Sequence, residues 1–362
     1  MKTLFADFVC RKKIPIFAKG KIYASNSNRK RGNNSMLKPK AKPFIKWVGG
    51  KTQLIEQING LLPHDFCRWN KVKYIEPFVG GGAMLFFMLQ RFENIHSAVI
   101  NDINPDLMRC YLTVRDHADD LIRSLEEVEG VYLGLETEEK RKEYFLQARQ
   151  KYNCKNLSDI ENTTLFIFLN KTCFNGLYRV NKKGQFNVPF GRYRNPQICC
   201  KETIMQDSEL LQKVEITTGD FEQTFLQAEG NTFFYFDPPY RPLTRTSSFT
   251  DYSKENFDDL EQMRLKQFCD KVSQSGYAFM LSNSDPKTAM KADNFFDDLY
   301  NSYDIHRVLA SRSINSVGSK RGKLTEILVR NFGSNYSKTQ NDFCSMPTCL
   351  VAEQEQVYSM LK

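Results

Sequence analysis

The sequence of 362 residues lacks any apolar run as long as a membrane span, and it does not open on an apolar segment followed by a small-residue cleavage site. Hydrophobic residues nevertheless make up 41% of the chain. A chain of this length and composition can bury a sizeable core, as one large domain or two ordinary ones. We therefore expect a soluble, globular protein that is neither secreted nor bound to a membrane.

The ten cysteines also lack any spacing typical of a metal site. There is no C-x-x-C pair, and only Cys199 and Cys200 lie close together. Structural zinc sites need paired Cys or His ligands at short spacings, so no metal site is predicted and the cysteines are expected to be reduced thiols in the core. No Pro-Cys dipeptide occurs either.

Acidic residues are nearly absent from the first 42 positions. This arm holds twelve Lys or Arg and one acid, Asp7, whereas the other 320 residues hold 39 basic and 41 acidic residues. The net charge of +9 thus belongs to the arm. The arm is expected to be flexible, and three interpretations stay open: a nucleic-acid-binding tail, a dispensable extension ahead of Met36, or an organelle-targeting segment.

A second acid-free stretch covers residues 165–200. Its basic residues alternate with aromatic ones; they are Lys171, Arg179, Lys182, Lys183, Arg192 and Arg194, among Phe174, Tyr178, Phe186, Phe190 and Tyr193. Positive charges neutralise phosphates and aromatic rings stack on bases. A solvated charged face would show the same residues, but the complete absence of acids favours nucleic acid as the partner.

Strand-like and helix-like segments alternate along the chain. Strands are predicted at 73–78, 97–103, 214–221, 231–240 and 277–284, with helices at 83–92, through 105–161 and at 257–272. Residues 179–188 resemble two short strands around a turn, and 306–332 a terminal hairpin. This alternation predicts an α/β fold with a mainly parallel sheet, whose ligands bind beyond the carboxyl ends of its strands.

The common phosphate-binding loops are missing. The turn after the first strand, residues 79–82, is not G-x-G-x-x-G, and Gly50-Lys51-Thr52 cannot be a Walker loop because Ile45 stands where that loop needs glycine. A Gly-rich turn still allows close backbone approach to a ligand. Asp102 follows Gly80 by 22 positions, a spacing at which an acid can meet ribose hydroxyls, so a nucleoside-containing cofactor fits.

The segment DPPY ends the aromatic run FFYF. The lone pair of an exocyclic base amine is delocalised into the ring, and acceptors placed on its two protons return electron density to the nitrogen. The Asp237 carboxylate and the Pro238 carbonyl are two such acceptors, and Tyr240 supplies a face for the base. A stray acid in a turn would give the same four letters.

Taken in order, FIKWVGGK, EPFVGGGAMLF, NDINPDL, LNKTCFNGLYRVNKKGQFNVPFGRY and FDPPY resemble the Dam-type DNA adenine-N6 methyltransferases, class D12 of the alpha group. The resemblance runs from about residue 43 to 332. It implies a Rossmann-like fold for S-adenosylmethionine-dependent methyl transfer, with an inserted, mainly helical target-recognition domain that carries a β-hairpin. The implied catalytic domain covers 43–109 and 201–332, the insert 110–200, the basic extension 1–42 and a polar tail 333–362.

The resemblance also assigns roles to residues. Those implied to bind the cofactor are Trp47, Lys51, Glu76, Pro77, Phe78, Gly80, Gly82, Asp102, Phe221 and Asp237; those implied in catalysis are Asp237, Pro238 and Tyr240; those implied to contact DNA are Phe174, Asn175, Leu177, Arg179, Arg192 and Tyr193. Phe174 departs from the family, which often has Tyr there, so a hydroxyl contact at this position is lost.

We accordingly expect methylation of adenine in double-stranded GATC sites by direct displacement, after the base flips out of the helix. The missing Pro-Cys pair agrees with a reaction that forms no enzyme–base adduct. A monomer in the cytoplasm of a bacterium, or encoded by a phage, is expected, and a partner restriction endonuclease is left open. Two alternatives remain: an amine methyltransferase acting on RNA or a protein amide, and a catalytically silent DNA-binding regulator.

Overall fold

The computed structural model describes residues 41–241, 257–288, 290–311 and 323–333. The predicted extension at 1–42 therefore lies outside the described residues except for its last two positions. The predicted tail at 333–362 lies outside them except for Gly333.

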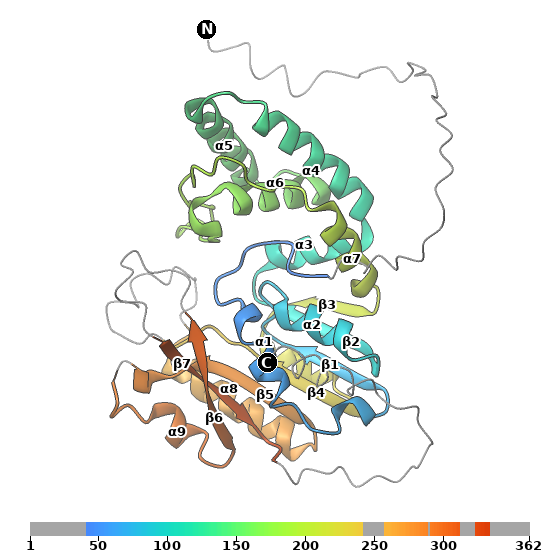
Figure 1. The fold of residues 1–362 in the computed structure, drawn as a ribbon, viewed down its shortest axis with the longest axis vertical. Coiled ribbons are helices and arrows are strands. Elements are labelled where there is room, and N and C mark those ends of the chain that lie inside the picture. The colour runs from blue at the N-terminus through green and yellow to red at the C-terminus, as the bar shows by residue number, and fades with distance from the viewer. Residues whose placement is uncertain (1–40, 242–256, 289, 312–322, 334–362) are drawn as a thin grey trace, which may run out of the picture. The chain divides into compact units, whose positions relative to one another are not determined.

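A seven-stranded sheet forms the centre of the described structure, in the order β3-β2-β1-β4-β5-β7-β6 (Figure 1). Neighbours are parallel from β3 to β5, and β7 runs antiparallel to both β5 and β6. The strands are β1 (Val72–Glu76), β2 (Ile95–Asp102), β3 (Val214–Thr218), β4 (Asn231–Phe236), β5 (Ala278–Ser284), β6 (Asp304–Ser311) and β7 (Lys323–Arg330). This order confirms the predicted α/β class and is consistent with a class I methyltransferase fold.

Both faces of the central strands β1, β4 and β5 are buried, which explains their largely apolar sequences. In β4, Phe233 and Tyr235 pack into one hydrophobic cluster, whereas Phe234 and Phe236 pack into the other. The first cluster includes α2 (Ala83–Arg91), α3 (Pro105–Asp116) and α7 (Lys201–Leu211), and the second includes α8 (Asp259–Gln274) and α9 (Phe295–Leu299). The sheet is thus a middle layer between two sets of helices.

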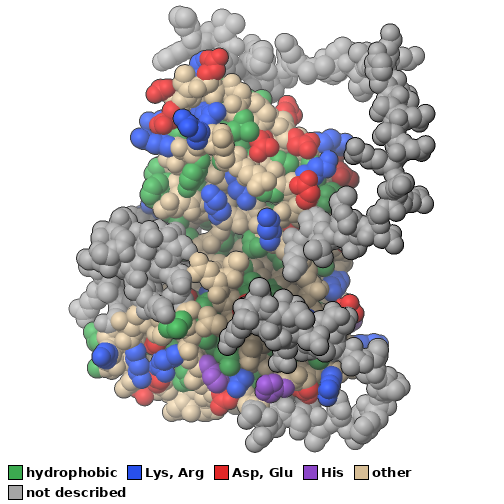
Figure 2. All heavy atoms as spheres, viewed as in Figure 1, with side chains coloured by type: hydrophobic (Ala, Val, Ile, Leu, Met, Phe, Trp, Pro, Cys, Tyr) green, Lys and Arg blue, Asp and Glu red, His purple; other side chains and the backbone are tan. Residues whose placement is uncertain are grey.

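The chain between β2 and β3 is mainly helical. It contains α3, α4 (Ala118–Leu133), α5 (Glu138–Asn153), α6 (Asp159–Thr172) and α7, and in Figure 1 the first three labels after α3 lie farthest from the sheet. Over these helices, the face drawn in Figure 2 carries Lys and Arg side chains mixed with acids and apolar groups. The predicted domain boundary at 109–110 falls inside α3. That these helices form a target-recognition domain stays a prediction.

Several elements differ from the prediction. Residues 179–188 form an isolated antiparallel bridge, Val180 to Phe186, rather than two strands. The helix α6 continues to Thr172, well into the acid-free segment, and α7 was not predicted. Nearly every residue of α6 from Asn162 onward is buried, so its sequence shows no amphipathic period that would indicate a helix. The terminal hairpin is confirmed as β6 and β7, but its loop at 312–322 lies outside the described residues.

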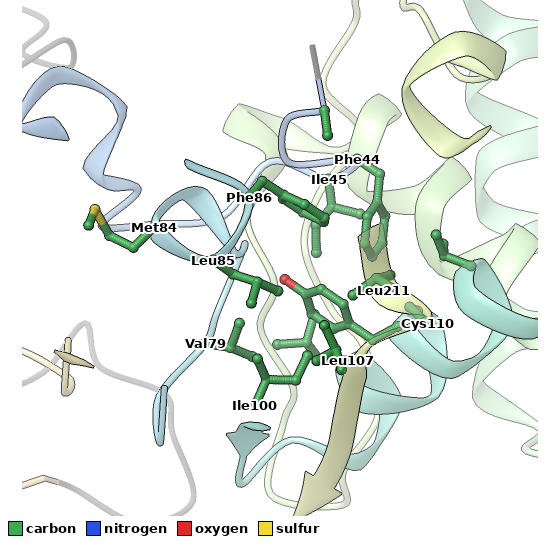
Figure 3. Close-up of a cluster of buried hydrophobic side chains, with 14 of the residues drawn as sticks. Phe44, Ile45, Val79, Met84, Leu85, Phe86, Ile100, Leu107, Cys110 and Leu211 are labelled. Atoms are coloured by element: carbon green, nitrogen blue, oxygen red, sulfur yellow. The ribbon is translucent and has the colours of Figure 1, made fainter. Parts of the chain in front are cut away.

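The Gly-rich turn between β1 and α2 is closely packed. Its walls include Val79 and the α2 residues Leu85 and Phe86, which Figure 3 shows in a cluster with side chains of the N-terminal loop, α3 and α7. Gly82 caps α2 with a φ of 75°, and a Cβ placed there would lie 2.5 Å from the Tyr111 hydroxyl. That hydroxyl donates to the Gly80 carbonyl at 2.9 Å. The turn therefore has no room for a side chain at Gly82.

We predict that Gly82→Ala lowers the free energy of unfolding by about 1–3 kcal/mol, because it places a side chain in a left-handed conformation against Tyr111. Gly130→Ala is the matched control. Gly130 lies in α4, where a Cβ would meet nothing within 4 Å, so alanine should raise stability by about 0.5–1 kcal/mol. Urea unfolding of the three proteins tests this, and equal effects of the two substitutions would contradict it.

Candidate active site

Three carboxylates lie at the carboxyl ends of adjacent parallel strands. Glu76 ends β1, Asp102 ends β2, and Asp237 follows β4 directly. Since β2, β1 and β4 are neighbours in the sheet, these ends lie along one edge. The chain moves outward from β1 through β2 to β3 and then returns to β4 on the other side of β1. Ligands of open α/β sheets bind at such a reversal.

The Asp237 carboxylate is held by two side chains. Its Oδ1 atom lies 2.8 Å from the Lys51 ammonium and accepts a hydrogen bond from the Ser282 hydroxyl at 3.1 Å. Burial raises the pKa of Asp237, and the Lys51 charge opposes that rise. Both contacts fall on Oδ1, so the carboxylate is fixed while Oδ2 takes part in neither of them. Pro238 is buried and Pro239 is exposed.

Lys51 joins Asp237 to Tyr240. It lies in the 3-10 turn η1 (Lys51–Gln53), and only 3% of it is exposed. Its ammonium donates to the Tyr240 hydroxyl at 2.5 Å and to the Gly49 carbonyl at 3.1 Å, and it lies 4.4 Å from the centre of the Tyr240 ring. The Tyr240 hydroxyl in turn donates to Glu326 Oε2 at 2.5 Å. The predicted residues Lys51, Asp237 and Tyr240 thus meet, with Glu326 as a fourth member.

Glu76 is almost fully buried. Its Oε2 atom accepts from the Tyr74 hydroxyl at 2.8 Å, and burial raises the pKa of Glu76 well above its ordinary value. Among the described residues no salt bridge to Glu76 is formed. This buried acid therefore suits a ligand that brings its own positive charge.

The side chain of Trp47 packs against the Gly-rich turn. A Cβ at Gly80 would lie 2.8 Å from its ring and one at Gly81 2.9 Å from its Cβ. On another side the Trp47 ring stacks on Tyr178, with 5.7 Å between ring centroids. Trp47 thus contacts both the turn after β1 and the acid-free segment.

Asp102 accepts backbone hydrogen bonds from Gly80 at 3.2 Å and Asn104 at 3.0 Å. Burial raises the pKa of Asp102 to about 6, although these N–H donors oppose the rise. The neighbouring Asn101 donates to the carbonyls of Pro77 and Gly219. The turn after β1 and the segment after β3 are therefore both tied to the end of β2.

Phe78 and Phe221, both predicted to contact the cofactor, pack against each other at 5.1 Å. Phe221 is only 4% exposed and belongs to the second hydrophobic cluster, with the Arg264 guanidinium 4.3 Å from its ring centre. Phe221 is therefore mainly a core residue.

Three of the six predicted DNA-contacting residues lie together. Phe174, Asn175 and Tyr193 lie together, since the Tyr193 hydroxyl accepts from the Asn175 N–H at 3.0 Å, and Phe174 is 52% exposed. Leu177 packs on the first cluster. Arg179 donates to Asn187 Oδ1 at 2.7 Å.

The side chain of Arg192 contacts helix α5. Its guanidinium is exposed and lies 3.4 Å from Glu138 of α5.

Asn170 links this segment to the N-terminal loop. It is 2% exposed, accepts from the Lys46 N–H at 2.8 Å, and donates to the carbonyls of Lys46 at 2.8 Å and Gly176 at 2.9 Å. The loop that carries Trp47 and Lys51 is thereby fixed to the end of α6.

Sequence reasoning missed Glu326, Ser282 and Asn170. Glu326 is 86 positions from Tyr240, and no local motif marks it. The available signal was an acid inside the otherwise apolar strand segment EILV, which a mostly buried strand tolerates only with partners.

Within the described ranges, the helices are too short or too polar to traverse a bilayer, and no cluster of three or more His, Cys, Asp or Glu side chains is arranged to hold a metal ion.

Comparison with known proteins gives concordant matches. Residues 47–314 match the family model described as D12 class N6 adenine-specific DNA methyltransferase. The chain is 48% identical over 295 residues to the type II methyltransferase M.MjaIII of Methanocaldococcus jannaschii, which covers 80% of this chain and 99% of the relative. It is 39% identical to M1.LlaDCHI of Lactococcus lactis subsp. cremoris (81% and 96%) and 32% identical to the DNA adenine methylase of Haemophilus influenzae (82% and 97%).

We predict that Asn170→Ala lowers the free energy of unfolding by about 2–4 kcal/mol, because three backbone groups of Lys46 and Gly176 lose their partner. Asn162→Ala is the control in the same helix. Asn162 is equally buried, but its amide oxygen has no hydrogen-bond partner, so its removal should cost less. Urea unfolding midpoints measure both, and a larger loss for Asn162→Ala would contradict the role of Asn170.

Proposed function

The chain belongs to the D12 class of N6 adenine-specific DNA methyltransferases, and from this we propose that it transfers a methyl group from S-adenosylmethionine to adenine N6 in GATC duplex sites, after base flipping. The observation that carries the proposal is the Asp237 carboxylate at the sheet reversal, held through Oδ1 by Lys51 and Ser282. An acceptor fixed in this way is what activation of an amine requires.

The strand ends fit S-adenosylmethionine, which supplies an electrophilic methyl group on a positively charged sulfur. Glu76 is a buried acid that forms no salt bridge within the described part of the chain, so it suits a cationic ligand group. Asp102 would accept hydrogen bonds from ribose hydroxyls, and the turn at Gly80 and Gly82 lets backbone approach the ligand. Trp47, Lys51, Pro77, Phe78 and Phe221 would complete the cofactor site.

Asp237 and the Pro238 carbonyl would accept hydrogen bonds from the two N–H groups of the target amine, which returns electron density to N6. Tyr240 would stack on the flipped base. The product ammonium is acidic enough to lose its proton to water, so the site needs no dedicated general base. Direct displacement of this kind leaves no covalent enzyme–base intermediate.

The acid-free segment would contact the duplex. Phe174, Asn175, Leu177, Arg179, Arg192 and Tyr193 remain the proposed contacts, and Arg179 is the natural reader of guanine because a guanidinium can donate to two acceptors on one base. Its contact with Asn187 orients the side chain before DNA binds.

Family membership disfavours the RNA or protein-amide alternative, and intact DPPY residues disfavour a silent regulator. Two of the relatives are named type II methyltransferases, which supports the further proposal that a restriction endonuclease acts on the same site. We also propose that the enzyme acts as a monomer in the cytoplasm.

We predict that Asp237→Asn lowers turnover at least about 100-fold while leaving duplex affinity intact, since the change removes the negative charge of one acceptor and leaves the proposed duplex contacts of the acid-free segment in place. Asp119→Asn, an exposed change in α4, should be silent. Transfer of labelled methyl groups to a GATC duplex, and to a duplex of equal composition without that site, measures turnover. Equal labelling of the two duplexes rules out the proposed site, and retained turnover in Asp237→Asn rules out the assigned role.

We predict that Arg179→Ala costs about 1–3 kcal/mol of discrimination at one base pair, because it removes a base contact. Lys183→Ala, in the turn of the same segment, should instead weaken binding to all duplexes alike and reduce its salt dependence. Competition binding with single-substituted sites separates the two. An equal loss of affinity for all sites in Arg179→Ala would indicate that Arg179 contacts the DNA phosphates rather than a base.

A further inference from the structure

Glu326 is an unusual residue for its place in the sheet. It lies on β7, opposite Ser284 of β5 and Val308 of β6. Its neighbour Ile327 packs into the second hydrophobic cluster and Leu328 into the first, so by alternation Glu326 shares the face of Leu328. Only 18% of its side chain is exposed. A carboxylate in such surroundings is costly unless it has partners.

Its partners are two residues of the proposed methylation site. Glu326 Oε2 accepts the Tyr240 hydroxyl at 2.5 Å and lies 3.8 Å from the Lys51 ammonium. Because Lys51 also contacts Asp237 at 2.8 Å, the four side chains form one chain of contacts: Asp237, Lys51, Tyr240 and Glu326. Glu326 is thus linked to Asp237 through Lys51, both directly and by way of the Tyr240 hydroxyl.

This arrangement fixes the Tyr240 ring. The hydroxyl accepts a hydrogen bond from the Lys51 ammonium and donates one to Glu326, so it is held both as an acceptor and as a donor. A ring held at its tip presents its face in a defined orientation, and a preset face lowers the entropy lost when a base stacks on it. Glu326 also shares the single ammonium with Asp237.

We infer that Glu326 is a positioning residue for methyl transfer: it orients Tyr240 through the hydroxyl and divides the Lys51 charge with Asp237. The inference rests on the proposed function. It adds a residue from the antiparallel strand β7 to a site otherwise built from parallel strands and the N-terminal loop.

The charges around Asp237 predict how the pH dependence of kcat changes when Glu326 is replaced. Lys51 from η1, Glu326 from β7 and Glu76 from β1 face it, with Tyr235 of β4, Tyr240 and the Ser282 hydroxyl. The negative charge of Glu326 raises the pKa of Asp237, whereas Lys51 lowers it. Removing the Glu326 charge must therefore lower that pKa, and the acidic limb of the kcat profile moves to lower pH, because Asp237 acts when ionised.

The first experiment compares Glu326→Gln, Glu326→Ala and the control Glu215→Gln, which changes an exposed acid on β3. Steady-state methylation of the GATC duplex gives kcat and KM from pH 5 to 9. Glu326→Ala should lower kcat about 10- to 100-fold with S-adenosylmethionine affinity unchanged. Glu326→Gln keeps an acceptor for Tyr240, so it should retain more kcat, yet both variants should shift the acidic limb downward. Glu215→Gln should do neither.

The second experiment is a double-mutant cycle with Tyr240→Phe, which keeps the ring and removes the hydroxyl. If Glu326 acts through that hydroxyl, adding Glu326→Gln to Tyr240→Phe costs much less kcat than Glu326→Gln costs alone. Additive losses, or an unshifted acidic limb, overturn the inference while wild-type methylation leaves the proposed function standing. Glu326→Gln and Tyr240→Phe both nearly conserve side-chain volume, so the cycle can be measured even if Glu326→Ala does not fold. A wild-type protein that methylates no duplex overturns both.

Discussion

The contact between Lys51 and Asp237 is the interaction on which the site depends. Lys51 is only 3% exposed, and a buried ammonium is stable only if its N–H groups have hydrogen-bond acceptors. Asp237, the Tyr240 hydroxyl and the Gly49 carbonyl are these acceptors. The same contact opposes the rise that burial causes in the pKa of the Asp237 carboxyl group. It also joins two segments 186 positions apart in the sequence, so the site exists only after the N-terminal loop has docked on the sheet.

Docking of that loop has a second consequence. Trp47 lies between the turn after β1 and Tyr178, and Asn170 forms hydrogen bonds with the backbone of the neighbouring Lys46. The loop is therefore in contact with the segment proposed to read DNA and with the turn proposed to hold the cofactor. A displacement of either segment would shift the loop and thereby the position of Lys51, which follows Trp47 by four residues. This gives a physical route by which the duplex and the cofactor can affect one another's binding.

The sequence predicted the layers well because the central strands β1, β4 and β5 are largely apolar and buried on both faces, and because several of their polar residues lie at the strand ends, where ligands of such sheets bind. It failed where burial removes periodicity. The helix α6 is buried on almost every side, so nothing in TLFIFL marks a helix, and the segment after it is held by single bridges and side-chain contacts rather than by strand pairing. Glu326 was missed for another reason: its partners come from distant segments, and only the three-dimensional register of β7 brings it to Tyr240.

The distribution of charge fits the two unlike ligands of the proposed reaction. The strand ends carry Glu76, Asp102, Asp237 and, through β7, Glu326, against the single ammonium of Lys51. In the acid-free segment at 165–200, all the charged side chains are positive. A cationic cofactor is thus favoured at the strand ends, whereas phosphates are favoured over the segment beside them. Ionised carboxylates at the strand ends would repel the duplex backbone, which agrees with the proposed approach of a flipped, uncharged base to Asp237.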